Sequence, residues 1–459
     1  MKLKIEMRGL LKALLCVGML TACGPHLTAQ TLTLDSCLAL ARKNNAEIRT
    51  SKLEVLKAQE VKRQVFTKYF PQLQLGAFGY YAADPLLSIG IDDIQTVKLR
   101  TMLQELRDEF SEKTDLFNDL EYMKKGASVS AVAAQPLFMG GRIVNGNRLA
   151  KLGVEAAELQ AVAKSRDVME NIESSYYLVT GLQQKVATLN AALELIDSID
   201  RTVQSALANG LVTKADALQV QLKRNEMLAN QQQLTSGIRL SKRLLCQQIG
   251  IEYSDELVFE EPSSPSMPPL SLNKSMQPDS LRPEVQLLRI NVQAEKLKKK
   301  MTIGEQLPQL AFIGIGFYGN IIKEADPKAN AVAMLSLQVP LTAWWENAHK
   351  IHQHNIAIEE AQIMQDNYNN LMSLEEEKAY SDMVDAYMLM KSDSSALDVA
   401  KENYRLANLN YVAGNKTIND VLQAHALLLQ AQNAITDRKT TYVVARRRLL
   451  DLRQNSEEQ

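Results

Sequence analysis

The stretch PQLQLGAFGYY at residues 71–81 decides the fold of this 459-residue chain, because PQLAFIGIGFY at residues 308–318 repeats it. Both copies begin with Pro-Gln-Leu and continue into glycines interspersed with apolar and aromatic residues. Further identities recur at one constant spacing: Pro136 with Pro340, Tyr176 with Tyr380, Gly210 with Gly414, Thr213 with Thr417, and Asp216 with Asp420. A duplicated unit of about 200 residues predicts two halves of one architecture rather than separate domains.

Each repeat contains two segments with the alternation of β-strands. The first repeat covers residues 30–249 and the second residues 282–459. We expect strands at about 71–82, 127–138, 309–320 and 331–341. A Pro/Ser-rich connector, residues 250–281, separates the repeats, and a charged segment, residues 86–125, is inserted between the first two strands. The sequence therefore predicts two hairpins, the first with a large insertion.

Long helices account for most of the remaining chain. Residues 141–208 and 343–412 are expected as the two longest helices, and neither contains proline. Apolar residues recur at the 3-4 spacing of a coiled-coil seam from Leu149 to Ala163 and again from Val421 to Ile435. At 1.5 Å per residue each helix would be about 100 Å long, which no globular core accommodates. Shorter helices are expected at 35–69, 213–249, 283–306 and 417–453. The pattern predicts a tall cylinder of antiparallel coiled-coil helices.

The fourth expected strand has the pattern of a sheet with one face in lipid. Ala333, Leu335, Leu337, Val339 and Leu341 fall on one face, and Met334, Ser336 and Gln338 fall on the other. A water-filled membrane barrel requires this alternation, although a strand of a soluble sandwich would look similar. Trp344 and Trp345 follow at once and suit an interfacial aromatic belt. The alternative for them is a pair of partly buried core tryptophans.

Four strands cannot close a membrane barrel, and unpaired strand edges are not tolerated in lipid. Association of several copies is therefore implied. Three copies would supply twelve strands, an even number within the bacterial range. In such a barrel we expect the inserted segment 86–125 on the side away from the long helices, facing the cell exterior.

Residues 1–29 have the features of a secretory signal peptide. Basic residues precede an apolar run at residues 10–22 that is too short to span a bilayer. The run ends in Leu-Thr-Ala followed by Cys23 and glycine, the pattern of a bacterial lipobox, in which the cysteine becomes the lipidated first residue. Ordinary cleavage near residue 29 is the alternative.

The composition argues against several classes of function. Because 52 Lys and Arg balance 53 Asp and Glu, nothing supports a nucleic-acid partner. His349, His352 and His354 have no accompanying Cys or Met cluster, and we interpret them as a solvated helix face rather than a metal site. The sequence has no nucleophile–base constellation, phosphate loop or zinc spacing, so we expect no enzyme and no cofactor. Cys37 and Cys246 are expected as buried, unpaired thiols, although export permits a disulfide.

Together these features resemble the TolC family of outer-membrane efflux ducts. The resemblance rests on Pro-Leu-Phe-x-Gly-Gly-Arg at residues 136–142 and on two helix-turn tips of the form Gly-x-x-Thr-x-x-Asp-x-Leu, which begin at Gly210 and Gly414. It covers about residues 35–453. It implies a homotrimer with a 12-stranded β-barrel in outer-membrane lipid and a periplasmic α-barrel. It also implies docking to a periplasmic adaptor (membrane fusion) protein and an inner-membrane transporter.

The resemblance also implies a periplasmic gate at the tips. Tyr411 and Lys416 would link the inner helix pair to its neighbour and keep the aperture shut, and Asp420 would narrow the pore. Asp216 on the first tip is the expected acceptor. Gln423 departs from the family, where a second acid is common, and this argues against a double ring of carboxylates. The alternative is that Asp216 and Asp420 only cap their helices.

We therefore expect the outer-membrane channel of a tripartite efflux system, which exports small molecules passively while an inner-membrane pump and an adaptor supply the energy. The same fold can serve as the duct of a type I protein secretion system. From another class, an exported coiled-coil spacer without a pore would share the long helices.

Overall fold

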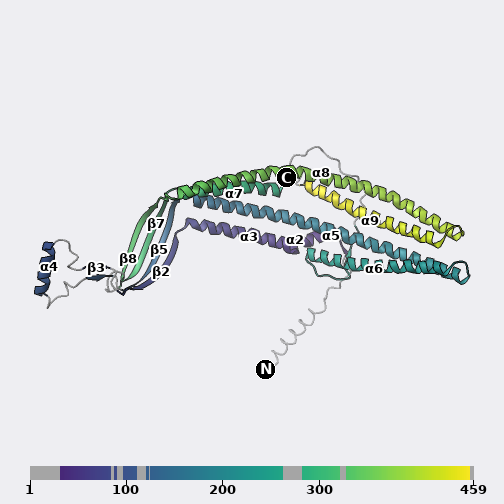
Figure 1. Cartoon of the computed structure of the whole chain (residues 1–459), viewed down its shortest axis with the longest axis horizontal. Helices are drawn as coiled ribbons and strands as arrows, with labels where there is room; N and C mark the ends of the chain where they lie inside the picture. Colours follow the sequence, from purple (N-terminus) through teal and green to yellow (C-terminus); the bar gives the residue numbers. More distant parts are fainter. Residues whose placement is uncertain are drawn as a thin grey trace, which may run out of the picture. The chain divides into compact units, whose positions relative to one another are not determined.

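The computed structural model describes residues 31–83, 87–89, 97–110, 120–122, 125–261, 282–320 and 327–454 (Figure 1). The signal-peptide region with Cys23, parts of the inserted segment and residues 262–281 of the connector lie outside these ranges. The chain divides into two compact units. A helix unit comprises Met1–Leu53, Gln160–Val285 and Tyr368–Gln459, and a strand unit comprises Glu54–Leu159 and Gln286–Asn367.

The strand unit contains a four-stranded antiparallel sheet. Its strands are, in spatial order, β2 (Gln72–Tyr81), β5 (Lys125–Met139), β7 (Gln309–Asn320) and β8 (Lys328–Gln338) (Figure 1). Each repeat contributes one hairpin, and the hairpins join through β5 and β7. In the inserted segment, β3 (Leu87–Ile89) pairs with β4 (Leu120–Tyr122), and α4 (Val97–Phe110) lies between them in sequence.

Strand β8 differs from the expected strand at 331–341, since it begins at Lys328 and ends at Gln338. The alternation of apolar and polar residues continues to Leu341, but the pairing does not. Gln338 lies opposite Gln309, the first residue of β7, and the preceding Pro308 has no N–H to donate. The hydrogen-bonded pairing of β8 with β7 therefore ends at Gln338, before the alternation of apolar residues ends at Leu341.

One face of the sheet is apolar and exposed. The register places Leu73, Ala133, Gly314 and Ala333 in one row across the four strands, and rows on the same face add Leu75, Phe312, Leu335 and Leu337. Leu73 and Leu75 expose 80% and 82% of their surface. The opposite face carries Gln72, Gln74, Ser130, Ser336 and Gln338 together with Ile313 and Ile315. The alternation in the sequence thus separates a predominantly apolar face from a mixed one.

Two glycines form the turn from β5 into the long helix α5 (Arg142–Ala208). Gly140 and Gly141 have φ of 61° and 78°, a left-handed conformation that costs other residues free energy. A Cβ on Gly140 would lie 2.0 Å from the carbonyl oxygen of Gly304, in the last turn of α7 (Pro283–Glu305). The Gly-Gly-Arg motif of the first repeat therefore serves both a turn and a close backbone approach.

The tryptophan pair lies in the first turn of α8 (Ala343–Val412). Trp344 and Trp345 expose 53% and 75% of their surface. The indole Nε1–H of Trp344 donates to the carbonyl oxygen of Gln306 at 3.1 Å. In the single chain these rings lie on the surface rather than in a core.

The helix unit consists of α2 (Leu34–Asn44), α6 (Lys214–Ile249) and α9 (Ile418–Gln454), with parts of α3 (Ala46–Phe66), α5 and α8. One apolar cluster in it includes Cys37, Ile172, Tyr176, Leu245, Cys246 and Phe259. The Tyr176 hydroxyl donates to the carbonyl oxygens of Leu32 (3.2 Å) and Glu260 (2.7 Å), beside the parallel pair of β1 (Thr31–Leu32) and β6 (Val258–Phe259). Cys37 and Cys246 are buried, free thiols.

The helix expected at residues 35–69 is interrupted at Asn45. Its side-chain oxygen accepts from the N–H groups of Glu47 (2.8 Å) and Ile48 (3.1 Å) and so caps α3. Its side-chain nitrogen donates to the carbonyl oxygen of Gln248 at 2.7 Å. Competition from this polar side chain explains the break. Within the described ranges, no helix is both long enough and apolar enough to cross a membrane.

Candidate functional site at the helix tips

The first tip, which connects α5 to α6, is held by hydrogen bonds of its own backbone and side chains. The N–H of Gly210 donates to Leu207 O (3.0 Å) and that of Leu211 to Ala206 O (2.9 Å), a Schellman ending. Gly210 has φ of 70° and open space around the position of a Cβ, so conformation rather than crowding requires a glycine. Thr213 then caps α6.

The carboxylate of Asp216 belongs to this cap. Its Oδ2 accepts from the N–H (2.9 Å) and the hydroxyl (2.7 Å) of Thr213, and its own N–H donates to Thr213 Oγ1 at 3.2 Å. The two residues form a capping box. The hydrogen bonds from Thr213 lower the pKa of Asp216.

The second tip reproduces the first. Gly414 has φ of 77°, and Asp420 Oδ2 accepts from the N–H (2.9 Å) and the hydroxyl (2.7 Å) of Thr417. These bonds lower the pKa of Asp420. Both aspartates therefore have the capping geometry that the sequence leaves open as an alternative, and both residues are partly exposed.

The remaining gate candidates are Tyr411 and Lys416, and among the described contacts only that of Tyr411 involves the first tip. Tyr411 packs against the apolar cluster of the tip helices, and burial followed by the charge of Asp216 raises its pKa. Lys416 is exposed, and within the described part of the chain no hydrogen bond or ion pair joins it to Asp216. The role of these residues as a gate stays a prediction.

Apolar residues hold the two tips together. Helix α9 contributes Ile418, Val421 and Leu422, α6 contributes Ala217 and Val220, and α5 contributes Val203. All are buried. The candidate polar residues thus lie beside a packed apolar contact between the hairpins of the two repeats.

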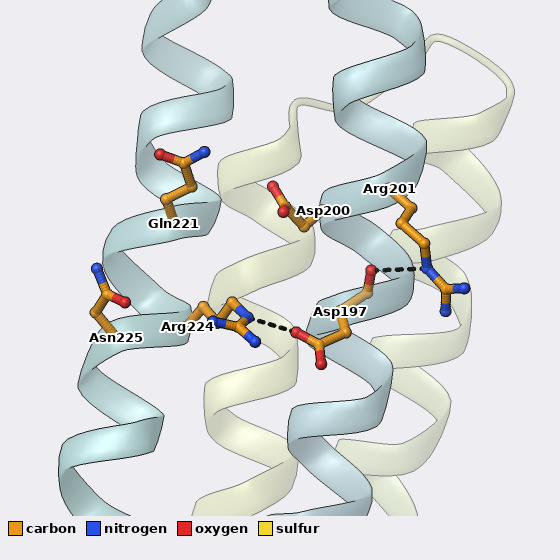
Figure 2. Close-up of a pocket in the computed structure, with 6 residues that line it drawn as sticks. All are labelled: Asp197, Asp200, Arg201, Gln221, Arg224 and Asn225. Carbon is orange, nitrogen blue, oxygen red and sulfur yellow. Dashed lines mark hydrogen bonds and ion pairs between the residues drawn. The ribbon is translucent and has the colours of Figure 1, made fainter.

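A polar groove of about 580 Å³ lies between α5 and α6 (Figure 2). Asp197, Asp200 and Arg201 line it from α5, and Gln221, Arg224 and Asn225 from α6. Arg224 Nε lies 2.6 Å from Asp197 Oδ1, and Arg201 donates to the Asp197 carbonyl oxygen at 3.2 Å. The ion pair makes the groove a polar seam between the helices of one hairpin.

A second polar cluster, which sequence reasoning missed, is buried between α5 and α9. Glu173 of α5 is buried, and its Oε2 lies 3.2 Å from Nε of Arg447 on α9. The available signal was its position between Ile172 and Tyr176, both deep in the apolar cluster. A charged residue inside an apolar stripe is the unusual observation there.

The histidines expected on a solvated face show one electrostatic contact, between His354 Nδ1 and Glu295 Oε2 at 3.6 Å. Among the described residues, no group of three His, Cys, Asp or Glu side chains could hold a metal ion.

Residues 37–244 match the family model of outer membrane efflux proteins. No curated protein matches the chain. Among solved structures, the Campylobacter jejuni CmeC outer membrane channel matches with a TM-score of 0.71 at 15% identity, over 92% of this chain and 85% of that one. The outer membrane protein VceC from Vibrio cholerae matches with a TM-score of 0.68 at 15% identity, over 91% and 95%. The open state of the Neisseria gonorrhoeae MtrE outer membrane channel gives 0.69 at 14%, over 92% and 88%.

The mainly helical architecture with four sheet strands per chain is thereby confirmed, since the solved channels share it. The family model covers the long helix of the first repeat and both of its strands. An outer-membrane location with a periplasmic extension, expected from the resemblance, is that of the family. Residues 37–244 of the chain thus match outer membrane efflux proteins, and over more than nine-tenths of its length the chain has the fold of solved outer membrane channels.

Proposed function

We propose that the chain is the outer-membrane channel of a tripartite efflux system, through which small molecules leave the cell passively. The observation that carries the proposal is the exposed apolar face of the sheet. Leu73 and Leu75 on the first hairpin expose 80% and 82% of their surface, and Leu335 and Leu337 on the second expose 64% and 66%. Such a patch needs a partner surface, because soluble proteins rarely leave one in water. Lipid is the partner that a barrel face would meet.

The assembly is a homotrimer. In the described sheet, β2 and β8 are edge strands, and their outer backbone groups must pair if the sheet lies in lipid. Three copies joined edge to edge would form a barrel of twelve strands. Trp344 and Trp345 would lie at the lipid–water interface, the inserted segment 86–125 would face the exterior, and Cys23 would carry the lipid anchor after removal of the signal peptide.

The channel itself supplies no energy. A periplasmic adaptor and an inner-membrane transporter are the partners, and Tyr411, Lys416, Asp216 and Asp420 form the gate that opens when they engage. The duct requires no cofactor and performs no enzymatic reaction.

A pair of neighbouring substitutions on β8 tests the membrane role. Leu335→Asp places a charge on the apolar face, and Ser336→Asp places the same charge on the opposite face. A charge facing lipid destabilises a barrel far more than one facing the lumen. We expect Leu335→Asp to abolish the heat-labile, detergent-extracted trimer and Ser336→Asp to leave it intact. Equal amounts of trimer for both variants, or release of the wild type without detergent, would instead indicate a non-porating spacer.

A second measurement separates efflux from secretion. A strain that lacks the gene should accumulate a fluorescent efflux substrate, and the wild-type gene should reverse this. If dye accumulation is unchanged while a protein disappears from the culture medium, the chain is the duct of a type I secretion system.

A further inference from the structure

The buried carboxylate of Glu173 lies at a contact between the two repeats. It belongs to α5 of the first repeat and faces α9 of the second. Its side chain is only 7% exposed, and its Oε2 lies 3.2 Å from Arg447 Nε without the alignment of a hydrogen bond. The carboxylate has therefore lost its water without a hydrogen bond to this oxygen in exchange, which disfavours its charged form.

A single guanidinium serves two carboxylates here. Arg447 Nε is also 3.2 Å from Asp451 Oδ1, one turn along α9. The charged groups around these two acids are Asp35 on α2, Arg166 and Glu170 on α5, and Arg447 and Arg448 on α9. Arg166 is paired with Glu284, and Arg448 lies 3.4 Å from Glu375. Arg166 and Arg448 are thus each paired with another acid, whereas the negative charges of Asp451, Glu170 and Asp35 act on Glu173.

This crowding is reflected in the titration of the cluster. Burial raises the pKa of Glu173 to about 7, Arg447 opposes the rise, and Asp451, Glu170 and Asp35 add to it. Burial also raises the pKa of Asp451. With Glu173 protonated, Arg447 can pair with Asp451 alone.

We propose that the contact between α5 and α9 is an acid-tightened lock between the two repeats, with Glu173 as the proton-binding group. When Glu173 loses its proton, its buried carboxylate and the partly buried carboxylate of Asp451 compete for one guanidinium, and the helices are held less tightly. The inference concerns packing within one chain and does not depend on what passes through the channel.

The direction in which pH changes the stability of this contact follows from the linkage between proton binding and folding. A carboxyl with a pKa raised in the folded chain makes the contact most stable below its ordinary pKa, near 4.5, and this stability is lost as the pH rises through about 7. Each pH unit between these values changes the opening equilibrium by up to about tenfold.

The duplication provides a matched control. Glu377 occupies the position in the second repeat that Glu173 occupies in the first, but it is exposed on α8. Glu173→Gln mimics the protonated lock, and Glu377→Gln makes the same chemical change outside it. Asp451→Asn removes the competing acid and should lower the pKa of Glu173.

Hydrogen exchange of the full-length, detergent-solubilised protein measures the lock directly. Protection of the α5 segment 168–180 and the α9 segment 440–451 is followed between about pH 5.5 and 8.5, corrected for intrinsic exchange. We expect wild-type protection to fall at least about tenfold over this range. The opening equilibrium constant should reach half of its high-pH plateau, the midpoint, near the raised pKa of the buried acid. Glu377→Gln should behave identically.

Glu173→Gln should keep the acid-level protection at high pH, and Asp451→Asn should move the midpoint to lower pH. The proposal is overturned if wild-type protection in these segments is independent of pH or if Glu173→Gln retains the wild-type dependence. It is equally overturned if Glu377→Gln removes that dependence. Should Glu173→Gln fail to fold, the shift in Asp451→Asn decides, and an unchanged midpoint there contradicts the lock.

Discussion

Replacement of Gly140 by alanine should disrupt the turn between β5 and α5 for two separable reasons. The residue has φ of 61°, so any side chain there is in the left-handed conformation. Its Cβ would also lie 2.0 Å from Gly304 O, a backbone atom that cannot move aside alone. The change therefore combines a conformational cost with a steric one.

Neighbouring glycines separate the two costs. Gly141 has φ of 78°, but the nearest atom to its Cβ would be Asn145 Nδ2 at an ordinary 3.6 Å. Gly141→Ala should cost only the left-handed conformation, about 1–2 kcal/mol. Gly140→Ala adds overpacking, typically about 1–3 kcal/mol, for a total of about 2–5 kcal/mol. Gly304→Ala, which approaches Gly140 O to 2.4 Å from within a helix, should show the steric part alone.

Urea unfolding followed by circular dichroism at the helix band ranks these variants. We expect Gly140→Ala to be the least stable of the three and Gly141→Ala to lose stability only through its conformation. Equal losses for Gly140→Ala and Gly141→Ala would refute the reasoning, because the contact with Gly304 would then contribute nothing.

Three further predictions follow from the described contacts and from the proposed assembly. Tyr176→Phe removes a hydroxyl that two carbonyl oxygens accept from and should lower the free energy of unfolding by about 1–3 kcal/mol in the same urea assay, whereas no loss would mean that water replaces it. Tyr411→Phe combined with Lys416→Ser should raise single-channel conductance in planar bilayers, and Asp420→Ala should weaken cation selectivity. Unchanged conductance and selectivity in these variants would mean that the residues only pack and cap the tip helices. Cys23→Ala should abolish incorporation of labelled fatty acid and leave unprocessed precursor, and a wild-type mature chain that starts at Gln30 would contradict lipidation.

The sequence allows the long helices and the paired strands to be predicted because their periodicities are local and occur twice. The break at Asn45 could not be predicted in this way, since its side chain caps α3 while also bonding Gln248, about 200 residues away. The end of β8 likewise depends on its partner strand and not on its own alternation.

The candidate site shows the same division. Both tip aspartates could be predicted as caps, because Thr-x-x-Asp after a glycine is a local signal. The Glu173 cluster could not, because Glu377 has the same place in its repeat and is exposed. Which of the two glutamates is buried depends on the helix that packs against it, and the sequence around either glutamate does not indicate that helix.

The junction of β5 with β7 has a consequence for how such a ring evolves. It joins the repeats antiparallel, in the same sense in which β8 of one copy would meet β2 of the next. A ring of three copies would then have approximately sixfold symmetry. Tethered seams, the β5–β7 contacts within one chain, would alternate with encounter seams, the contacts between β8 of one copy and β2 of the next. The tethered seam tolerates the bulge between Pro136 and Phe138, because its partners can never separate. Selection for regular pairing should therefore act most strongly on β2 and β8, where a single substitution is repeated at all three encounter seams.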